Sequence, residues 1–539
     1  MTQNKKLVLI TIASVQEKIS EAVKTSELYA NSNSISECIK KIYESIKGRY
    51  SDMNFDLVLP MIEENNKIHS FPNYILFTVE SDKSSFDFEK EVNDEVVKLN
   101  EYDYEIFVSS VEIENDYNES YQKVHGRMNA IKSGRGSIDR AKTNLEIGAS
   151  KKPGKCIVCG IAEINEENLD SICGRCQGKR KTLSPSTVDV ATLEWRAEAD
   201  ISLIKELEVI LDKEKSELKD CKANGYYVQN AYSFNNQVKN KLEEINKLVE
   251  FEASHYYALI QIDLDDFGKH LSGLYCSKTS ALTLKEYQKK LSLELIKFNK
   301  KIAEKLEEYS KKMVAKKQLS IYMGGDDLLF FCPVYKIPEI LDLVECKLVE
   351  INNDLKNEKL ITVSRSIVIA HESTPLKKVL RQSSEALKTI KTVYKTDGKN
   401  GIAFSLFNTS ANKYFSYLKM EKETLNSLCI LVKGFKNEIA SNFIANLERE
   451  FLGLVAPVEF DEHKCLRKLI KSEIRRNLIR KLKSSSEKSI DNYTRTMENL
   501  ISSMVCRENN RYFIDVHRYF NLLHILQKIS AETKSWEVR

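Results

Sequence analysis

The stretch of sequence that decides the fold reads Ser320-Ile321-Tyr322-Met323-Gly324-Gly325-Asp326-Asp327-Leu328-Leu329-Phe330-Phe331. Two apolar runs flank a Gly-Gly-Asp-Asp turn, which predicts a β-hairpin with adjacent carboxylates at its tip. Adjacent acids repel each other, so a rigid hairpin that holds them together indicates a divalent cation nearby. The alternative for these four residues alone is an ordinary turn with solvated acids.

A second acidic strand end lies upstream. The nearly continuous apolar run from Tyr256 to Leu264 predicts a central strand, interrupted by Asp263 near its end and followed by Asp265 and Asp266. If this strand lies beside the hairpin, Asp263 converges with Asp326 or Asp327. Two Mg²⁺ or Mn²⁺ ions there could activate a 3′-hydroxyl and stabilise a leaving pyrophosphate. Together the two motifs favour a catalytic metal site over solvated turns.

The surrounding periodicity predicts a ferredoxin-like βαββαβ palm domain. An amphipathic stripe from Leu284 to Tyr309 predicts one long helix between the two motifs. The segments after the hairpin are expected to form a helix at 338–355, a strand at 360–370, a helix at 376–394 and a strand at 401–407. Strand, helix, hairpin, helix and strand is the order of that fold.

A second palm-like unit is predicted at the N-terminus, with strands at 6–13, 72–80 and 103–113 and a helix after Val15. It carries no Gly-Gly-Asp-Asp turn, so we expect it to be structural and to complete a composite nucleotide pocket with the other palm. The alternative is an unrelated α/β domain.

Paired cysteines form the next motif. Cys156 and Cys159 make one Cys-x₂-Cys pair, and Cys173 and Cys176 make another after thirteen intervening residues. Four thiolates at this spacing can surround Zn²⁺ tetrahedrally, which predicts a structural site with no open position. The alternatives are an iron–sulfur cluster, which prefers a different spacing, and reduced thiols without a metal.

The chain is therefore predicted to be an α/β (α+β) multidomain protein. The expected divisions are a degenerate N-terminal palm-like domain, a zinc-binding module, a helical bridging domain, a catalytic palm and a C-terminal helical bundle, at 1–145, 146–182, 183–252, 253–412 and 413–539. Leu and Ile recur at helical spacing among charged residues in the bridging segment. A basic loop is expected from Ile131 to Pro153, because it contains Gly134 and Gly136.

Composition fits a cytoplasmic protein. The 539 residues carry a net charge of only +4, so the overall charge says little about nucleic acid. The segment from His463 to Lys483 contains nine Lys or Arg and one Glu, and its Leu and Ile residues repeat at helical spacing. One helix face is therefore expected to pack, while the cationic face could meet RNA, an acidic partner or solvent. No signal-peptide pattern and no run of eighteen apolar residues is evident, so we expect no membrane contact. The remaining cysteines are single, which suggests reduced thiols.

The motifs resemble the large, polymerase-like subunit of type III CRISPR RNA-guided effector complexes. Four features carry the resemblance: the strand end Ile262 to Lys269, the Gly-Gly-Asp-Asp hairpin, the run Ser366 to His371, and the paired cysteines upstream of the palm. The opening, from Leu7 to Glu17 and then Ala22 to Ala30, is similar to the Cmr (III-B) branch.

The resemblance implies a cyclase that converts ATP into cyclic oligoadenylates when target RNA is bound. Asp263, Asp326 and Asp327 would be catalytic and bind the two Mg²⁺ or Mn²⁺ ions. Nucleotide contacts would come from Gly324, Gly325, Leu264, Asp265, Ser366, Lys395 and Lys399. The implied partners are guide RNA (crRNA), target RNA and sister Cmr-type subunits.

Many relatives begin with an HD nuclease domain, but none of the eight histidines here is followed directly by Asp. We therefore expect no DNase activity in this subunit. Two alternatives to the cyclase remain: a non-catalytic scaffold of the same ribonucleoprotein, and a stand-alone cyclase with a palm similar to diguanylate cyclases. The latter carry Gly-Gly-Asp/Glu-Glu-Phe at the hairpin, whereas this chain has Gly-Gly-Asp-Asp-Leu.

Overall fold

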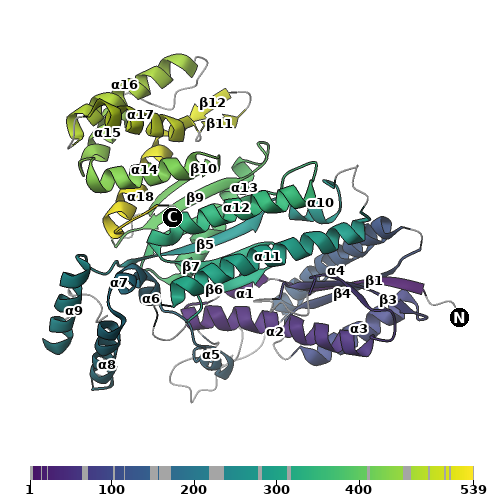
Figure 1. The fold of residues 1–539 in the computed structure, drawn as a ribbon. Coiled ribbons are helices and arrows are strands. Elements are labelled where there is room, and N and C mark those ends of the chain that lie inside the picture. The colour runs from purple at the N-terminus through teal and green to yellow at the C-terminus, as the bar shows by residue number, and fades with distance from the viewer. Residues whose placement is uncertain are drawn as a thin grey trace.

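The computed structural model contains two sheet domains side by side, a group of bridging helices and a C-terminal helical domain (Figure 1). It describes residues 4–13, 15–20, 22–62, 71–100, 104–114, 116–145, 156, 172–217, 236–276, 282–311, 313, 317–409, 413–452, 463–482, 486–502, 505–508 and 511–537. The expected fold class, an α+β multidomain chain with two palms, is confirmed.

The first palm is a ferredoxin-like domain with a four-stranded antiparallel sheet in the order β2-β3-β1-β4. Its strands are β1 (Asn4–Ile12), β2 (Asp56–Leu59), β3 (Tyr74–Ser81) and β4 (Ile106–Glu112). Its helices are α1 (Val15–Ser20), α2 (Thr25–Arg49), α3 (Ser85–Leu99) and α4 (Tyr117–Leu145). The short β2 was not predicted. Helix α4 runs through the segment 131–145, where a loop was expected.

The second palm has the same plan with two extra strands, in the order β10-β9-β8-β5-β7-β6. Its strands are β5 (Tyr256–Leu264), β6 (Ser320–Gly324), β7 (Asp327–Cys332), β8 (Val363–His371), β9 (Gly401–Phe407) and β10 (Lys413–Lys419). Its helices are α10 (Phe267–Leu271), α11 (Leu284–Ser310), α12 (Ile337–Leu355) and α13 (Leu376–Val393), with the 3₁₀ turn η3 (Val334–Lys336). Strand β10 pairs with β9, so the palm sheet continues past the expected boundary at 412.

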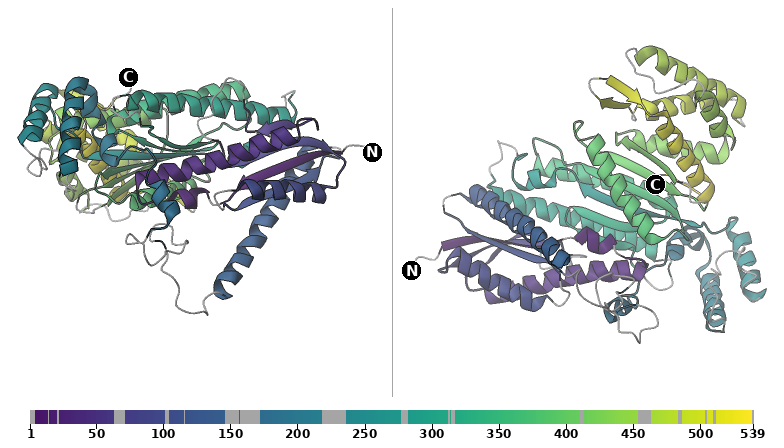
Figure 2. Two further views of the ribbon diagram at one scale, coloured as in Figure 1. Left: turned by 90° about the horizontal axis from the view of Figure 1, so that it is seen from below. Right: turned by 180° about the vertical axis from the view of Figure 1, so that it is seen from behind.

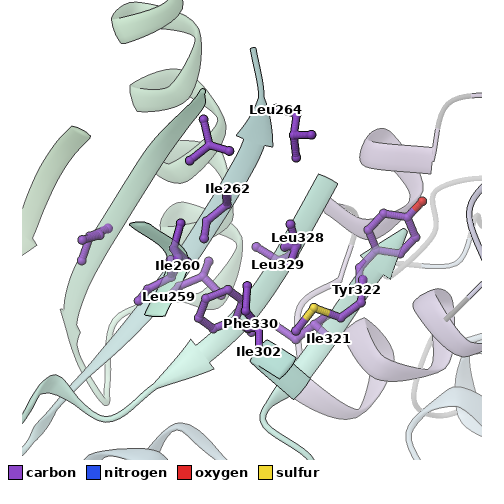
Figure 3. Close-up of a cluster of buried hydrophobic side chains, with 14 of the residues drawn as sticks. Leu259, Ile260, Ile262, Leu264, Ile302, Ile321, Tyr322, Leu328, Leu329 and Phe330 are labelled. Carbon is purple, nitrogen blue, oxygen red and sulfur yellow. The ribbon is translucent and has the colours of Figure 1, made fainter. Parts of the chain in front are cut away.

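Helices cover both faces of the second sheet, which explains why β5 reads as an almost continuous apolar run. Helix α12 lies on the face of Arg365, whose guanidinium contacts Glu345 of that helix. Helix α13 lies on the other face, where Ser383 Oγ donates to Gln261 Oε1 at 3.0 Å. Figure 3 shows buried apolar side chains of β5, β6 and β7, including Ile262 and Leu328, which belong to the main hydrophobic core.

The two palms contact each other directly through α2, α4, β2 and the hairpin. Tyr29 Oη donates to the Gln318 carbonyl at 2.6 Å, and Ser32 Oγ donates to the Ile321 carbonyl at 2.5 Å. Tyr117 Oη donates to Gln288 of α11 at 2.7 Å. The turn of the second palm is therefore held against the first palm, as the paired-palm prediction requires.

The bridging helices form a small core of their own, centred on Trp195 and Leu207. They are α6 (Thr187–Ala191), α7 (Leu193–Glu198), α8 (Ile201–Glu217) and α9 (Asn236–Val249). Helices α8 and α9 protrude from one end of the paired palms (Figure 2), whereas α6 packs against β5 and places Val190 and Ala191 in the palm core.

The C-terminal domain packs on β10 through α18 and is helical, as expected, with a short hairpin added. Its elements are α14 (Thr424–Asn437), α15 (Phe443–Leu452), α16 (His463–Lys481), α17 (Glu487–Ser502), β11 (Val505–Glu508), β12 (Arg511–Ile514) and α18 (Val516–Glu532). The basic helix is α16. Its Arg475 pairs with Asp491 of α17, and its Arg476 pairs with Glu450 of α15. Part of its charge is thus neutralised within the domain.

Among the described helices, none is both long and apolar enough to cross a lipid bilayer.

The turn between β6 and β7 depends on its second glycine. Gly325 has φ +74°, a backbone conformation that side chains with a Cβ disfavour. Its carbonyl accepts a hydrogen bond from Asn299 Nδ2 of α11 at 3.0 Å, which fixes the turn on the helix below. A Cβ at Gly325 would lie 3.6 Å from Pro72, so space does not forbid one and the backbone conformation is the constraint.

We expect Gly325→Ala to lower the free energy of unfolding by about 1–2 kcal/mol, because alanine must adopt the left-handed conformation. Urea denaturation measures this as a lower midpoint. The matched control is Gly268→Ala in α10, where a Cβ would meet no atom within 4 Å and φ is not positive. Equal midpoints for the two variants would contradict the assignment.

Candidate active site

Three carboxylates meet at one end of the second palm sheet. In the β5–β7 register Asp263 lies directly opposite Asp327, so their side chains share one face of the sheet. Asp326 precedes β7, and its carbonyl accepts from the Leu264 amide at 3.1 Å, which closes the turn onto the end of β5. The predicted convergence of Asp263, Asp326 and Asp327 is therefore present.

The electrostatics of this group favour a cation. Burial, and then the negative charges of Asp326 and Asp263, raise the pKa of Asp327 well above the usual carboxyl range. Burial and Asp263 likewise raise the pKa of Asp326. Asp327 Oδ1 is buried and has no hydrogen-bond partner among the described residues. An orphaned carboxylate oxygen among like charges is what a Mg²⁺ or Mn²⁺ ion would satisfy, so the residues fit the metals implied.

One cation of the protein itself reaches this group. Lys391, near the end of α13, contacts Asp263 Oδ1 through Nζ and lowers the pKa values of both Asp326 and Asp327. Lys391 was missed from the sequence. A signal for Lys391 was available in the sequence. Ser383 of α13 contacts Gln261, which lies two residues before Asp263 on β5. Lys391 follows Ser383 by eight residues, beside the buried stripe of the same helix.

The first palm also contributes a side chain to the site. Gln16 of α1 donates from Nε2 to Asp327 Oδ2 at 3.1 Å. The atoms nearest to a Cβ placed on Gly325 belong to Pro72, just before β3, and to Tyr74, the first residue of β3. The two palms thus meet at the Gly-Gly-Asp-Asp turn, which supports the predicted structural pairing. Gln16 is a further residue that the sequence did not single out for the site.

Gly324 has a packing role that the sequence did not reveal. A Cβ there would fall 1.9 Å from Tyr322 Oη, so the buried tyrosine ring occupies the space beside it. Only glycine fits at position 324 while the Tyr322 ring keeps this conformation. Room for a triphosphate at Gly324 and Gly325 stays a prediction.

Asp265 and Leu264 occupy places different from those expected of nucleotide contacts. Leu264 is buried. Asp265 is buried too, and its carboxylate accepts from Ser364 Oγ at 2.7 Å, Thr362 Oγ1 at 3.0 Å and the Asn400 amide at 3.0 Å. These bonds tie the end of β5 to β8 and to the turn after α13. In this conformation Asp265 is a structural carboxylate and is unavailable to a nucleotide.

Ser366 lies on the α13 face of β8, opposite Gln261, and is fully buried. Its hydroxyl has no hydrogen-bond partner among the described residues. It shares a sheet face with Asp263 but is covered, so a contact with a base or ribose stays a prediction.

Lys395 and Lys399, which were predicted to contact phosphates, lie on the turn that follows α13. Lys399 Nζ contacts Asp266 Oδ1 at 2.9 Å, and Lys359 binds the other oxygen at 2.9 Å. These two lysines, acting against burial, hold the pKa of Asp266 far below its usual range. Lys395 is exposed on the same turn. Lys399 is thus engaged by Asp266, and phosphate contacts by either lysine stay predictions.

Three of the four zinc-module cysteines come together. The sulfur atoms of Cys156, Cys173 and Cys176 are buried and lie within 4.8 Å of one another. The Cys173 amide donates to Cys156 Sγ at 3.3 Å, and Cys173 and Cys176 flank the start of α5 (Gly174–Lys179). Cys159 lies outside the described residues. This donor set fits a thiolate-bound Zn²⁺, which stays a proposal.

The module rests on the first palm. Arg180 Nε, just after α5, donates to the buried carboxylate of Glu27 in α2 at 2.7 Å. Thr25 and Ser184 share a hydrogen bond of 3.2 Å.

Comparison with known proteins agrees with this geometry. Residues 256–403 match the family model for the second palm domain of Cas10/Cmr2. The chain is similar in fold to a chain of the cryo-EM structure of the type III-B Cmr-beta bound to cognate target RNA. The TM-score is 0.64 at 13% identity, covering 98% of this chain and 83% of that one. For the apo state of Cmr-beta the TM-score is 0.62 at 13% identity, covering 98% and 82%. No curated protein matches the sequence.

The second palm is thus a Cas10/Cmr2-type palm, and the whole chain has the fold of a Cmr-beta component. The family match of the second palm and the likeness in fold both agree with the resemblance inferred from the sequence.

We expect Asp263→Asn and Asp327→Asn to weaken Mn²⁺ binding at least ~10-fold, since each removes a ligand charge. Asp265→Asn should leave Mn²⁺ affinity within about 3-fold but lower the free energy of unfolding by about 1–3 kcal/mol, because buried partners lose their acceptor. Isothermal titration and urea denaturation measure the two quantities. Loss of Mn²⁺ binding in a folded Asp265→Asn protein would contradict the structural assignment.

Mn²⁺ binding should strengthen as pH rises. A raised carboxyl pKa means that the folded protein keeps protons that the unfolded chain has lost. The metal-free protein should thus lose stability from mildly acidic to mildly alkaline pH, while Mn²⁺ affinity rises by up to ~10-fold per pH unit for each proton displaced. Melting temperature against pH, with and without Mn²⁺, measures both. Asp327→Asn should flatten the metal-free slope, and an unchanged slope would contradict this account.

Cys176→Ser should remove one bound zinc per chain and lower the melting temperature, because a thiolate ligand is lost. Metal analysis by mass spectrometry gives the zinc content. The control is Cys346→Ser, an exposed cysteine of α12. Equal zinc content in both variants would argue against the module.

Proposed function

We propose that this protein is the large subunit of a type III-B CRISPR effector complex and converts ATP into cyclic oligoadenylates when target RNA is bound. The observation that carries the proposal is the cluster of Asp263, Asp326 and Asp327 at the end of β5 and β7. The raised pKa values of Asp326 and Asp327, the adjacent Asp263 carboxylate and the orphaned oxygen of Asp327 are suited to nucleotidyl transfer.

The carboxylates would hold Mg²⁺ or Mn²⁺, with Asp263 on one strand and Asp326 and Asp327 on the other. When bound, such ions activate a ribose hydroxyl and neutralise the charge that develops on the leaving pyrophosphate. The register of β5 and β7 fixes Asp263 and Asp327 before any ligand arrives, so little reorganisation is needed.

Other residues of the chain would orient the triphosphate. Lys391 reaches the carboxylates from α13, and Lys395 and Lys399 follow it on the turn that Asn400 anchors to Asp265. A triphosphate arriving here would meet these ammonium groups, which can contact phosphate oxygens as point charges. Gln16 would keep Asp327 oriented from the side of the first palm.

Membership in a ribonucleoprotein is supported by the likeness to Cmr-beta, which was solved with cognate target RNA. The proposed partners of this chain are guide RNA, target RNA and sister Cmr-type subunits. A stand-alone cyclase is less well supported, because the likeness spans nearly the whole chain and includes the first palm and the C-terminal helices.

The test is to assemble the chain with its guide RNA and sister subunits and supply ATP with Mg²⁺ or Mn²⁺. Mass spectrometry would read the products with and without matched target RNA. We expect cyclic oligoadenylates only with target RNA, and a loss of at least ~10²-fold in Asp326→Asn/Asp327→Asn, because the metal ligands are removed. The control is Asp354→Asn, which neutralises an exposed carboxylate of α12.

No product from an intact complex with bound target RNA would favour the non-catalytic scaffold. Product from the isolated chain, independent of RNA, would favour the stand-alone cyclase.

A further inference from the structure

A second cluster of metal-ligand side chains lies at the opposite end of the palm sheet. His255 precedes β5, His371 ends β8, and Glu372 follows it. Asp263 is eight residues along β5 from His255, a separation of about 26 Å at ~3.3 Å per strand residue. This cluster is therefore distinct from the carboxylates of the candidate active site.

The backbone fixes the three residues relative to one another. Tyr256 lies opposite His371 in the antiparallel β5–β8 register. The ladder continues one step further, because the Glu372 amide donates to the His255 carbonyl at 2.8 Å. The Glu372 carbonyl accepts from Thr187 Oγ1 of α6 at 3.1 Å. The side chains thus start from a rigid sheet end.

The donor atoms converge. His255 Nδ1 lies 3.9 Å from Glu372 Oε1, and one donor atom from each of the three side chains lies within 4.8 Å of the others. The two imidazole rings are nearly parallel, at 9°, with centroids 5.2 Å apart. Donors bound to one Zn²⁺ at ~2.1 Å lie roughly 3.4 Å apart, so small side-chain rotations would close the site.

A neighbouring hydroxyl can orient one of the imidazoles. His371 Nδ1 lies 2.7 Å from Ser373 Oγ. The Ser373 amide also donates to Nδ1, at 3.3 Å, so a metal at Nε2 requires the other tautomer, in which Nδ1 gives up that contact and donates its proton to Ser373 Oγ. Histidine ligands are commonly oriented in this way by a hydrogen bond at their other nitrogen.

We propose that His255, His371 and Glu372 form a second metal site that binds Zn²⁺ or a similar late transition-metal ion. Two imidazole nitrogens and one carboxylate make a donor set that suits such ions and not Mg²⁺, which prefers oxygen. The cluster is half-buried, so a water molecule can complete the coordination. The ion would join the ends of β5 and β8, near the contacts of these strands with α6 and α18.

The alternative is that the two histidines only stack and that His255 pairs with Glu372 when protonated. Stacking requires no particular donor directions, whereas a metal site requires the carboxylate and both imidazoles. Substitutions that keep shape but remove one donor therefore separate the two accounts.

The test is metal titration of the full chain. The wild-type protein should bind one equivalent of Zn²⁺ more than Glu372→Gln and His371→Ala, measured by mass-spectrometric metal analysis after equilibrium dialysis. Ser373→Ala should lower the affinity for this additional Zn²⁺ by roughly 10–100-fold. His517→Ala, an exposed histidine of α18, is the control.

Co²⁺ substitution distinguishes this site from the cysteine module. A thiolate-bound Co²⁺ gives an intense sulfur charge-transfer band, whereas a His₂Glu site does not. We expect the near-ultraviolet band to be the same in wild type and Glu372→Gln, while the weak visible bands diminish. If stoichiometry and spectra are the same in wild type, His371→Ala and Glu372→Gln, the proposal is wrong. Because ATP turnover is not the readout, this outcome is independent of the cyclase proposal.

Discussion

Asp263 and Asp327 face each other across neighbouring strands, and with Asp326 they concentrate negative charge in a poorly solvated turn. Such repulsion must be offset within the fold. Three contacts hold the turn in place: the β5–β7 register, the Leu264–Asp326 backbone hydrogen bond, and the hydrogen bond from Asn299 to the Gly325 carbonyl. The main hydrophobic core, with Ile262 and Leu328, stabilises the strands that carry the acids. Local destabilisation at a site is commonly supported by such surrounding structure.

The first palm supplies part of that support. Gln16 contacts Asp327, and α2 holds the β6 edge through Tyr29 and Ser32. A shift of the first palm would therefore change the surroundings of the Gly-Gly-Asp-Asp turn. The zinc-module cysteines are linked to the same helix through Arg180 and Glu27. This contiguous set of contacts connects the module, the first palm and the site.

The main elements could be predicted because strong patterns specify them. The apolar run of β5, the stripe of α11 and the turn at Gly325 each carry one dominant local signal. The strand β2 has only four residues, and β10 alternates weakly, so neither rises above its neighbours. Helix α4 contains glycines, each of which lowers the stability of a helix by about 1 kcal/mol, so local propensity alone argues against a helix there.

The carboxylates of the site could be predicted for the same reason, since strand ends and a turn determine them. Lys391 and Gln16 could not, because their contacts depend on how α13 and the first palm dock on the sheet. Asp265 illustrates the opposite difficulty. It stands in the acidic motif two residues from Asp263, yet Ser364, Thr362 and Asn400 all donate hydrogen bonds to its carboxylate. Sequence adjacency places an acid near a site, but its hydrogen bonds decide whether it is left available to a ligand. The orphaned oxygen of Asp327 and the hydrogen-bonded carboxylate of Asp265 therefore separate the proposed metal-binding role from the structural role.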